Sequence, residues 1–152
     1  MKTQLTFFVL IALFANFAFA RIGYTENECD SQYGAWNPAV GKNIRVYNIG
    51  GISVSCAFID GKCEAVRYDL GENIPSGETI NKLLDKNGGT DRWEEYERNY
   101  WRSSSRAKPK WAEFYKYDGR HLLWIKTDKY VEQMRKEKEA REKNKGDAVD
   151  KL

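Results

Sequence analysis

The stretch "ISVSCAFIDGKCEAVRYDL", residues 52–70, decides the fold, because polar and apolar side chains alternate on both sides of an Asp-Gly pair. Alternation with a period of two is typical of a half-buried β-strand. Asp60-Gly61 predicts a two-residue hairpin turn, since both central residues of a type I′ turn need positive φ. With that loop, the expected cross-strand pairs are Phe58 with Cys63, Cys56 with Ala65, and Val54 with Arg67. The core stripe is then Ile52, Val54, Cys56 and Phe58.

The residues before this hairpin predict a short helix and a further strand. Thr25 and Glu28 have the spacing of a capping box, and Gly34 favours a helix end, so we expect a helix over 26–33. From Asn43 the period changes to two, and the glycine pair at 50–51 turns the chain into the hairpin strand.

The residues after the hairpin predict a helix, three strands and a last helix. The middle helix begins at the N-cap Ser76, carries apolar residues at 80, 83 and 84, and stops near 87–88. Strands are expected over 95–101, 111–117 and 121–127, the last two joined by a second Asp-Gly turn at 118–119. The final helix is capped by Thr127 or Asp128, with Tyr130, Val131 and Met134 pointing inward.

This order of elements predicts an α+β fold. We expect an antiparallel sheet of about six strands, in the order α-β-β-β-α-β-β-β-α, with the helices packed on one face. The other face of such a sheet can stay in water, so a binding surface is expected there.

The two ends of the chain differ from its middle. Residues 1–20 have a basic Lys2, an apolar run over 5–19 and small residues at Ala18 and Ala20, which predicts an export signal cut after Ala20. An uncleaved membrane anchor is the alternative, but the apolar run is short for a span. We therefore expect a secreted or periplasmic protein without a membrane anchor after cleavage, with one α+β domain over 21–134. Residues 135–152 are charged and predict a solvated helix end or tail.

Three short motifs carry a resemblance to known proteins. The helix ending in "ECDSQYG", the hairpin "AFIDGK" and the helix "INKLLDKNGG" before a Trp-containing strand resemble a class of small exported bacterial proteins of uncharacterised function. The plan of helices against an antiparallel sheet is similar to the outer-membrane assembly lipoprotein BamE and to the proteinaceous β-lactamase inhibitors. That resemblance implies protein binding and carries over no functional residue.

Signals for catalysis, cofactors and metals are weak in this chain. His121 is the single histidine, no glycine-rich phosphate loop occurs, and no motif places a base beside the serines at 103–105. The crowded carboxylates at 94, 95 and 97 are explained by a polar strand face. We expect no catalytic residue, no cofactor and no metal site, and an enzyme ranks behind the binding hypotheses below.

Three cysteines in an exported chain predict one disulfide and one leftover thiol. Cys56 and Cys63 sit diagonally across the hairpin, beyond the usual disulfide span. We therefore expect Cys29 on the first helix to pair with Cys63, leaving Cys56 as a buried thiol. Three reduced core cysteines are the alternative.

The segment "RNYWRSSSRAKPKWAEFYKY", residues 98–117, alternates aromatic rings with positive charges although the whole chain carries a formal charge of only +3. This pattern predicts an exposed aromatic and basic face. The expected binding residues are Tyr96, Arg98, Tyr100, Arg102, Arg106, Lys108, Lys110, Trp111 and Tyr115.

Two functions fit this face, and a solvated sheet surface without a ligand is the plain alternative. The first is a protein-binding or structural module that meets another extracytoplasmic protein. The second is a binder of an anionic polymer, such as nucleic acid or cell-wall acid, through residues 98–120. The oligomeric state is left open.

Overall fold

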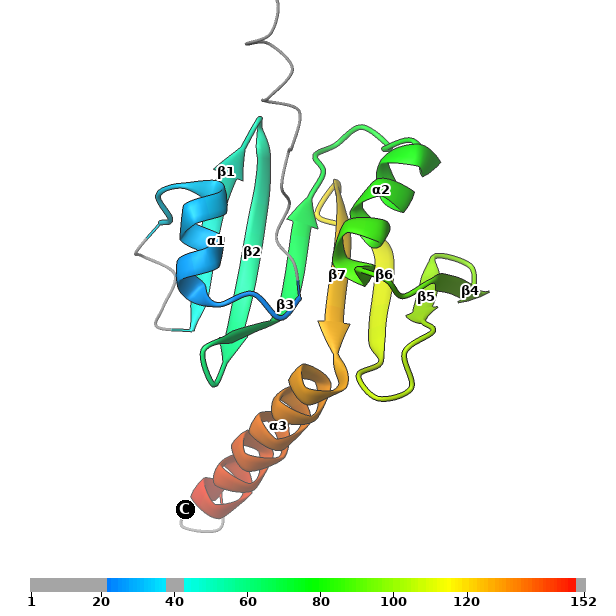
Figure 1. The fold of residues 1–152 in the computed structure, drawn as a ribbon. Helices are drawn as coiled ribbons and strands as arrows, with labels where there is room; N and C mark the ends of the chain where they lie inside the picture. Colours follow the sequence, from blue (N-terminus) through cyan, green and yellow to red (C-terminus); the bar gives the residue numbers. More distant parts are fainter. Residues whose placement is uncertain (1–21, 38–42, 150–152) are drawn as a thin grey trace, which may run out of the picture.

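The computed structural model describes residues 22–37 and 43–149 and shows an α+β fold with one antiparallel sheet (Figure 1). The expected signal peptide falls outside the described residues. Along the sheet the strands lie in the order β1-β2-β3-β7-β6-β5-β4. The elements in chain order are α1 (Glu26–Tyr33), β1 (Ile44–Ile49), β2 (Ile52–Ile59), β3 (Lys62–Asp69), α2 (Gly77–Gly88), β4 (Trp93–Glu97), β5 (Tyr100–Ser103), β6 (Lys110–Tyr117), β7 (Arg120–Thr127) and α3 (Asp128–Val149).

The helix caps and hairpin turns match the sequence expectations. Thr25 and Glu28 form the capping box of α1, and the Ser76 side chain caps α2. In the turn between β2 and β3, Asp60 and Gly61 both adopt positive φ, at 52° and 71°. These local signals determine where elements begin and end, because each satisfies backbone groups or a backbone conformation that few residues can.

The sheet has seven strands because the expected strand over 95–101 is two strands. The chain turns at Arg98 and Asn99, and Glu97 pairs with Tyr100 across the hairpin. Asn99 adopts φ of 66°, a conformation that asparagine tolerates better than most residues. No glycine marks this turn, so the single-strand prediction was wrong.

The central hairpin contains a β-bulge that changes its predicted register. Phe58 pairs with Cys63 as expected, but Ala57 pairs with Ala65, so Glu64 has no partner in β2. A bulge shifts every later residue of its strand by one position and so exchanges the two faces. The predicted pairs of Cys56 with Ala65 and Val54 with Arg67 were therefore wrong.

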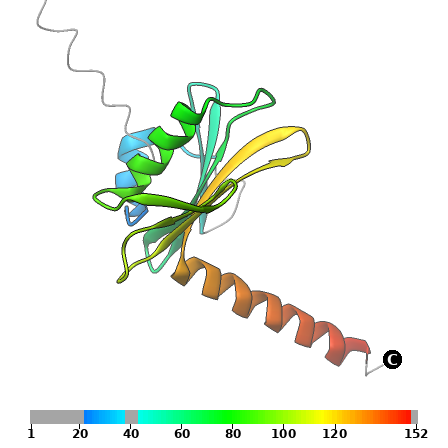
Figure 2. The ribbon, with the colours of Figure 1, turned by 90° about the vertical axis from the view of Figure 1, so that its right-hand side faces the viewer.

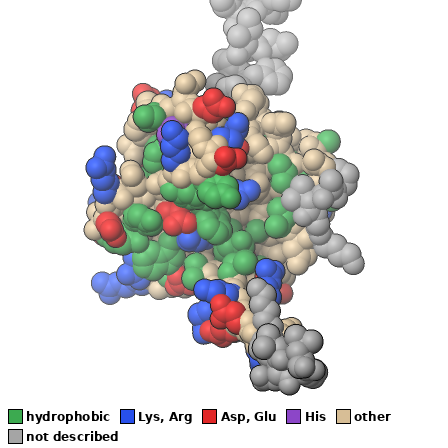
Figure 3. Space-filling model, turned by 180° about the vertical axis from the view of Figure 1, so that it is seen from behind, with side chains coloured by type: hydrophobic (Ala, Val, Ile, Leu, Met, Phe, Trp, Pro, Cys, Tyr) green, Lys and Arg blue, Asp and Glu red, His purple; other side chains and the backbone are tan. Residues whose placement is uncertain are grey.

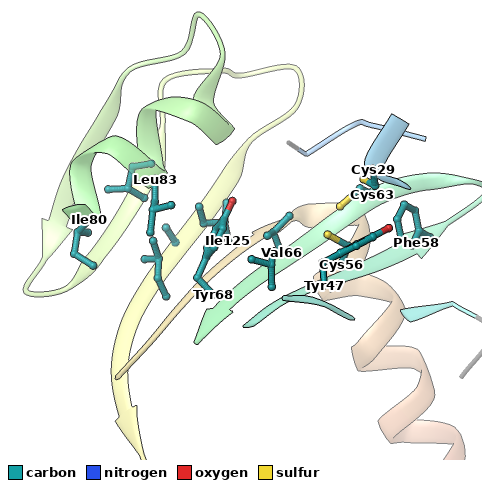
Figure 4. Packing of buried hydrophobic residues seen from close by; sticks show 14 residues of the cluster. Cys29, Tyr47, Cys56, Phe58, Cys63, Val66, Tyr68, Ile80, Leu83 and Ile125 are labelled. Atoms are coloured by element: carbon teal, nitrogen blue, oxygen red, sulfur yellow. The ribbon is translucent and has the colours of Figure 1, made fainter. Parts of the chain in front are cut away.

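The core lies between the sheet and the two helices α1 and α2, which cover the same face (Figure 1). Val66 and Tyr68 of β3 enter this core beside Val54 and Cys56 of β2. Ile80 and Leu83 of α2 belong to the same buried cluster as Tyr68 and Ile125 (Figure 4). The buried stripe expected for β2 is confirmed at Val54, Cys56 and Phe58, while Ile52 is partly buried.

Helix α3 departs from the expected arrangement, because it runs away from the sheet on the side opposite α1 and α2 (Figure 2). Tyr130 packs on Trp124, but Val131 and Met134 are 43% and 39% exposed, so the inward orientation predicted for those two was wrong. Beyond Met134 the helix continues on charge pairs between successive turns, including Lys136 with Glu132. Within the described residues, no helix is long and apolar enough to cross a membrane.

Candidate binding surface on the helix-free face

The face of the sheet opposite α1 and α2, here called the helix-free face, carries a row of aromatic side chains. Figure 3 shows hydrophobic side chains gathered over its centre. The Tyr96 ring lies 6.3 Å from the Tyr100 ring and 6.0 Å from the Trp111 ring, with an edge-to-face angle of 85° to Trp111. Further along, Trp124 and Tyr130 meet edge to face at 5.9 Å. Offset and edge-to-face pairs are favourable ring geometries, so these rings hold one another in place.

Cations lie on or beside three of the aromatic side chains of this face. The Arg102 guanidinium is 4.7 Å from the centroid of the Trp111 ring, and the Lys126 ammonium is 4.2 Å from that of Trp124. Both distances are within the range of cation–π attraction. Burial raises the pKa of Tyr115, and the charge of Arg67 and its hydrogen bond to the phenol act against that rise.

The charges of this surface are unevenly neutralised. Lys126 is paired with Glu113 at 2.9 Å, and Trp111 donates its indole N–H to Asp128. Within the described part of the chain, no ion pair joins a carboxylate to any of five nearby arginines and lysines. These five are Arg67, Arg98, Arg102, Arg106 and Lys108. The surface therefore offers positive charge that the fold itself does not use.

The structure brings together four of the nine predicted binding residues and places a fifth on the same face. Three contacts link these four residues: Tyr96 meets the rings of Tyr100 and Trp111, and the Arg102 guanidinium lies over Trp111. Tyr115 shares their face, because it is two positions from Glu113, which pairs with Tyr100. Tyr96 and Tyr100 are 58% and 38% exposed, so a partner can reach them.

The other four predicted residues lie elsewhere. Arg98 is in the turn between β4 and β5, and Arg106 and Lys108 are exposed in the loop before β6. Lys110 points to the helix side, where its ammonium binds Asp91 at 2.5 Å and the Gly88 carbonyl at 3.0 Å. The assignment of Lys110 to the binding face is therefore corrected, because residues alternate along β6 and Lys110 shares the side of the buried Ala112.

Four residues of this surface were missed from the sequence: Arg67, Trp124, Lys126 and Tyr130. The alternation in 121–127 could have identified Trp124 and Lys126, since Leu123 and Ile125 take the core side. The predicted register had no bulge and paired Arg67 with Val54 on the core side. No local signal could therefore have identified Arg67 as part of this surface. Tyr130 was expected to pack inward, and it does pack on the sheet, but against Trp124 of the helix-free face.

Two hollows in the described part of the chain lie near the predicted binding residues. A shallow hollow of about 160 Å³ lies on the helix-free face between Val46, Arg67, Trp124 and Tyr130. A larger one of about 840 Å³ opens beside the loop before β6 and contains Lys110, Asp91, Glu64 and Lys129. Two of its lysines lie beside carboxylates of the same hollow, because Lys110 pairs with Asp91 and Lys129 lies 3.8 Å from Glu64.

The three cysteines form a separate cluster on the helix side. All three are buried and free, so the predicted Cys29–Cys63 disulfide is not present in the structure. The three sulfurs lie within 4.8 Å of one another, on the side of the sheet that α1 covers. Hydrogen bonds from Cys56 and Cys63 lower the pKa of the Cys29 thiol, and their bonds to Cys29 raise the pKa values of the other two.

Comparison with known proteins does not place the chain in a family. No protein-family model, no curated protein and no solved structure matches it. The resemblance to small exported bacterial proteins, BamE and the β-lactamase inhibitors therefore stays a prediction.

Proposed function

We propose that this protein is an exported, non-enzymatic binding module whose helix-free face receives a partner protein with exposed carboxylates. The observation that carries the proposal is Arg102 lying on Trp111, whose ring contacts Tyr96, with no carboxylate paired to Arg102 among the described residues. An arginine fixed by an aromatic ring keeps its donors free for a carboxylate fork.

The composition of this surface supports a protein partner. Tyr, Trp and Arg are the side chains that most often dominate the binding energy of protein interfaces. Rings already packed on one another lose little rotamer freedom on binding, which lowers the entropic cost of association. The row of rings from Tyr96 to Tyr130 supplies such a pre-arranged surface.

A second candidate, binding to an anionic polymer, is favoured by a different set of side chains. Arg98, Arg106 and Lys108 are exposed in the two loops beside β5, and none has a carboxylate partner among the described residues. A polyanion is bound by positive side chains placed along its backbone. Aromatic rings beside those side chains can stack on nucleic-acid bases.

Capture experiments with matched variants test the first proposal. The mature protein is immobilised and exposed to the native extracellular fraction, and bound proteins are quantified for wild type, Tyr96→Ala and Arg102→Ala. We expect each variant to weaken capture of the same protein by about tenfold or more, the loss typical of an interface anchor. The control Lys82→Ala removes an exposed cation of α2, on the opposite side of the sheet, and should capture as wild type does.

Salt dependence separates the two candidates. Binding of single-stranded DNA or a cell-wall acid releases counterions, so its affinity falls steeply with salt, by a power that grows with the number of phosphates neutralised. Such binding should depend on Arg98, Arg106 and Lys108. A partner captured equally well by the Arg102→Ala and Tyr96→Ala variants, with unchanged circular dichroism, would contradict the protein-docking proposal.

A further inference from the structure

Three thiols from three different elements converge beneath α1. Cys29 comes from α1, Cys56 from β2 and Cys63 from β3, and each has no solvent exposure. Their sulfurs lie within 4.8 Å of one another, and Figure 4 shows them beside Phe58 and Tyr47. The fold therefore brings three sulfur donors from three elements around one point.

Several contacts hold this arrangement in place. Arg45 of β1 forms ion pairs with Glu26 and Asp30 of α1, and the Tyr47 hydroxyl donates to Asp30 at 2.8 Å. Backbone bonds between Cys63 and Tyr24, 2.7 Å long, and between Gly23 and Cys63 fasten the chain before α1 to β3. The helix that carries Cys29 is thus anchored on the two sides of the cluster.

The spacing of the sulfurs suits a single metal ion. A metal–sulfur bond of about 2.3 Å in a trigonal arrangement puts the three sulfurs about 4 Å apart, so the cluster would have to contract by less than about 1 Å. Among the described residues, no histidine or carboxylate oxygen joins the three sulfurs within their spacing. The donor set is therefore sulfur alone.

Sulfur donors without a fourth ligand select the class of ion. Thiolates prefer soft ions such as Cu(I) and also bind zinc, but structural zinc sites are four-coordinate and tetrahedral. The Tyr33 hydroxyl is buried without a hydrogen-bond partner, and it lies one turn from Cys29 on the same face of α1. A buried phenol is suited to donating a hydrogen bond to a ligating thiolate, which is the role of an outer partner in metal sites.

We propose that Cys29, Cys56 and Cys63 form a binding site for one Cu(I) ion. The ion replaces protons of the thiols, which pass to solvent, and the copper keeps its oxidation state. Because the sulfurs are inaccessible in the folded chain, the ion enters as the chain folds or when α1 lifts from the sheet. This site is independent of the helix-free face and of any partner bound there.

Copper uptake during refolding tests the site directly. The mature chain is reduced, unfolded and refolded without oxygen in the presence of Cu(I) supplied as its acetonitrile complex, then desalted. We expect one copper per chain by elemental analysis, a thiolate-to-copper charge-transfer band in the ultraviolet, and three sulfur neighbours by X-ray absorption. The bound ion should also raise the thermal midpoint relative to the copper-free protein.

Variants distinguish a ligand site from a merely well-packed core. Cys56→Ala keeps a small apolar side chain and should abolish copper uptake and the midpoint shift, whereas Val66→Ala opens a nearby cavity, keeps all three thiols and should still bind one ion. Tyr33→Phe should weaken copper affinity by about 10- to 100-fold, as loss of an outer partner does. The proposal is overturned if the wild type takes up no copper, if folded Cys56→Ala binds as much, or if Zn²⁺ is bound and Cu(I) is not.

Discussion

At the scale of single residues, Glu64 determines which face of the sheet the later side chains of β3 take. Its place outside the β2–β3 pairing sends Val66 and Tyr68 into the core and Arg67 to the helix-free face. Without the bulge, Ala65 and Arg67 would point inward, and burying an unpaired guanidinium is costly. The bulge therefore decides which side chains of β3 reach the candidate binding surface.

Gly88 is a second residue whose role depends on a contact that the sequence does not reveal. A Cβ built at Gly88 would lie 2.7 Å from the indole nitrogen of Trp93, whose N–H donates to the Leu84 carbonyl at 2.6 Å. In an open helix position, alanine is favoured over glycine by about 1 kcal/mol. At Gly88 the clash with Trp93 outweighs this preference for alanine. We therefore predict that Gly88→Ala lowers the free energy of unfolding, measured with denaturant, by about 1–3 kcal/mol.

Gly77 provides the matched control in the same helix. A Cβ there meets nothing within 4 Å, so Gly77→Ala should leave stability unchanged or raise it slightly. Equal effects of the two substitutions would show that Trp93 does not pack as described.

At the scale of elements, features set by neighbouring residues were predicted from the sequence, and features set by contacts between distant residues were not. The cap of α1 at Thr25 and the Asp-Gly turns were predicted because each signal acts over a few residues. The turn at Arg98-Asn99 lacks glycine, and the bulge at Glu64 is chosen by which side chains the core accepts. The direction of α3 depends on Tyr130 docking on Trp124, a contact between side chains that no periodic pattern encodes.

The far end of α3 is predicted to contribute little to the stability of the domain. Beyond Met134 the helix is held by surface pairs such as Arg135 with Glu139 and Lys138 with Glu142. Exposed pairs of this kind contribute a few tenths of a kcal/mol each. Deleting residues 141–152 should therefore shift the thermal midpoint by less than about 2 °C. Removing the ring that docks the helix, by Tyr130→Ala, should lower the midpoint clearly, and a large effect of the deletion would show that the helix end docks.

At the scale of the whole molecule, the sheet joins two sets of hairpins that are consecutive in the chain. Strands β1 to β3 form one set and β4 to β7 the other, and they meet where β3 pairs with β7, with Val66 opposite Ile125. The β4–β5 turn apart, each set is predictable from its turns. The pairing that unites them is not, because it closes a long stretch of chain that includes α2 and depends on burial of both strands under that helix.

Ionic contacts between distant parts of this sheet predict acid sensitivity. Asp69 at the end of β3 binds Arg120 of β7 at 2.7 Å, and this hydrogen bond lowers the pKa of Asp69 below its usual 3.8. The Thr25 backbone likewise lowers the pKa of Glu28 below its usual 4.5. A carboxyl with a depressed folded-state pKa stabilises the fold above its unfolded pKa and loses that contribution as pH falls through the folded value. We therefore predict a thermal midpoint that is steady near neutral pH and falls below about pH 4.5.

Substituting Asp69, which joins β3 to β7, measures how much of this acid sensitivity comes from the contact between Asp69 and Arg120. Asp69→Asn cannot ionise, so the variant should melt at a lower temperature than wild type at pH 7 and lose less of its midpoint between pH 5 and pH 3, because one linked proton is gone. Glu97→Gln removes an exposed carboxylate from the edge strand β4 and should follow the wild-type curve. If Asp69→Asn shows the full wild-type loss over that interval, the contact between β3 and β7 does not depend on the charge of Asp69, and the acid response comes from other carboxylates such as Glu28.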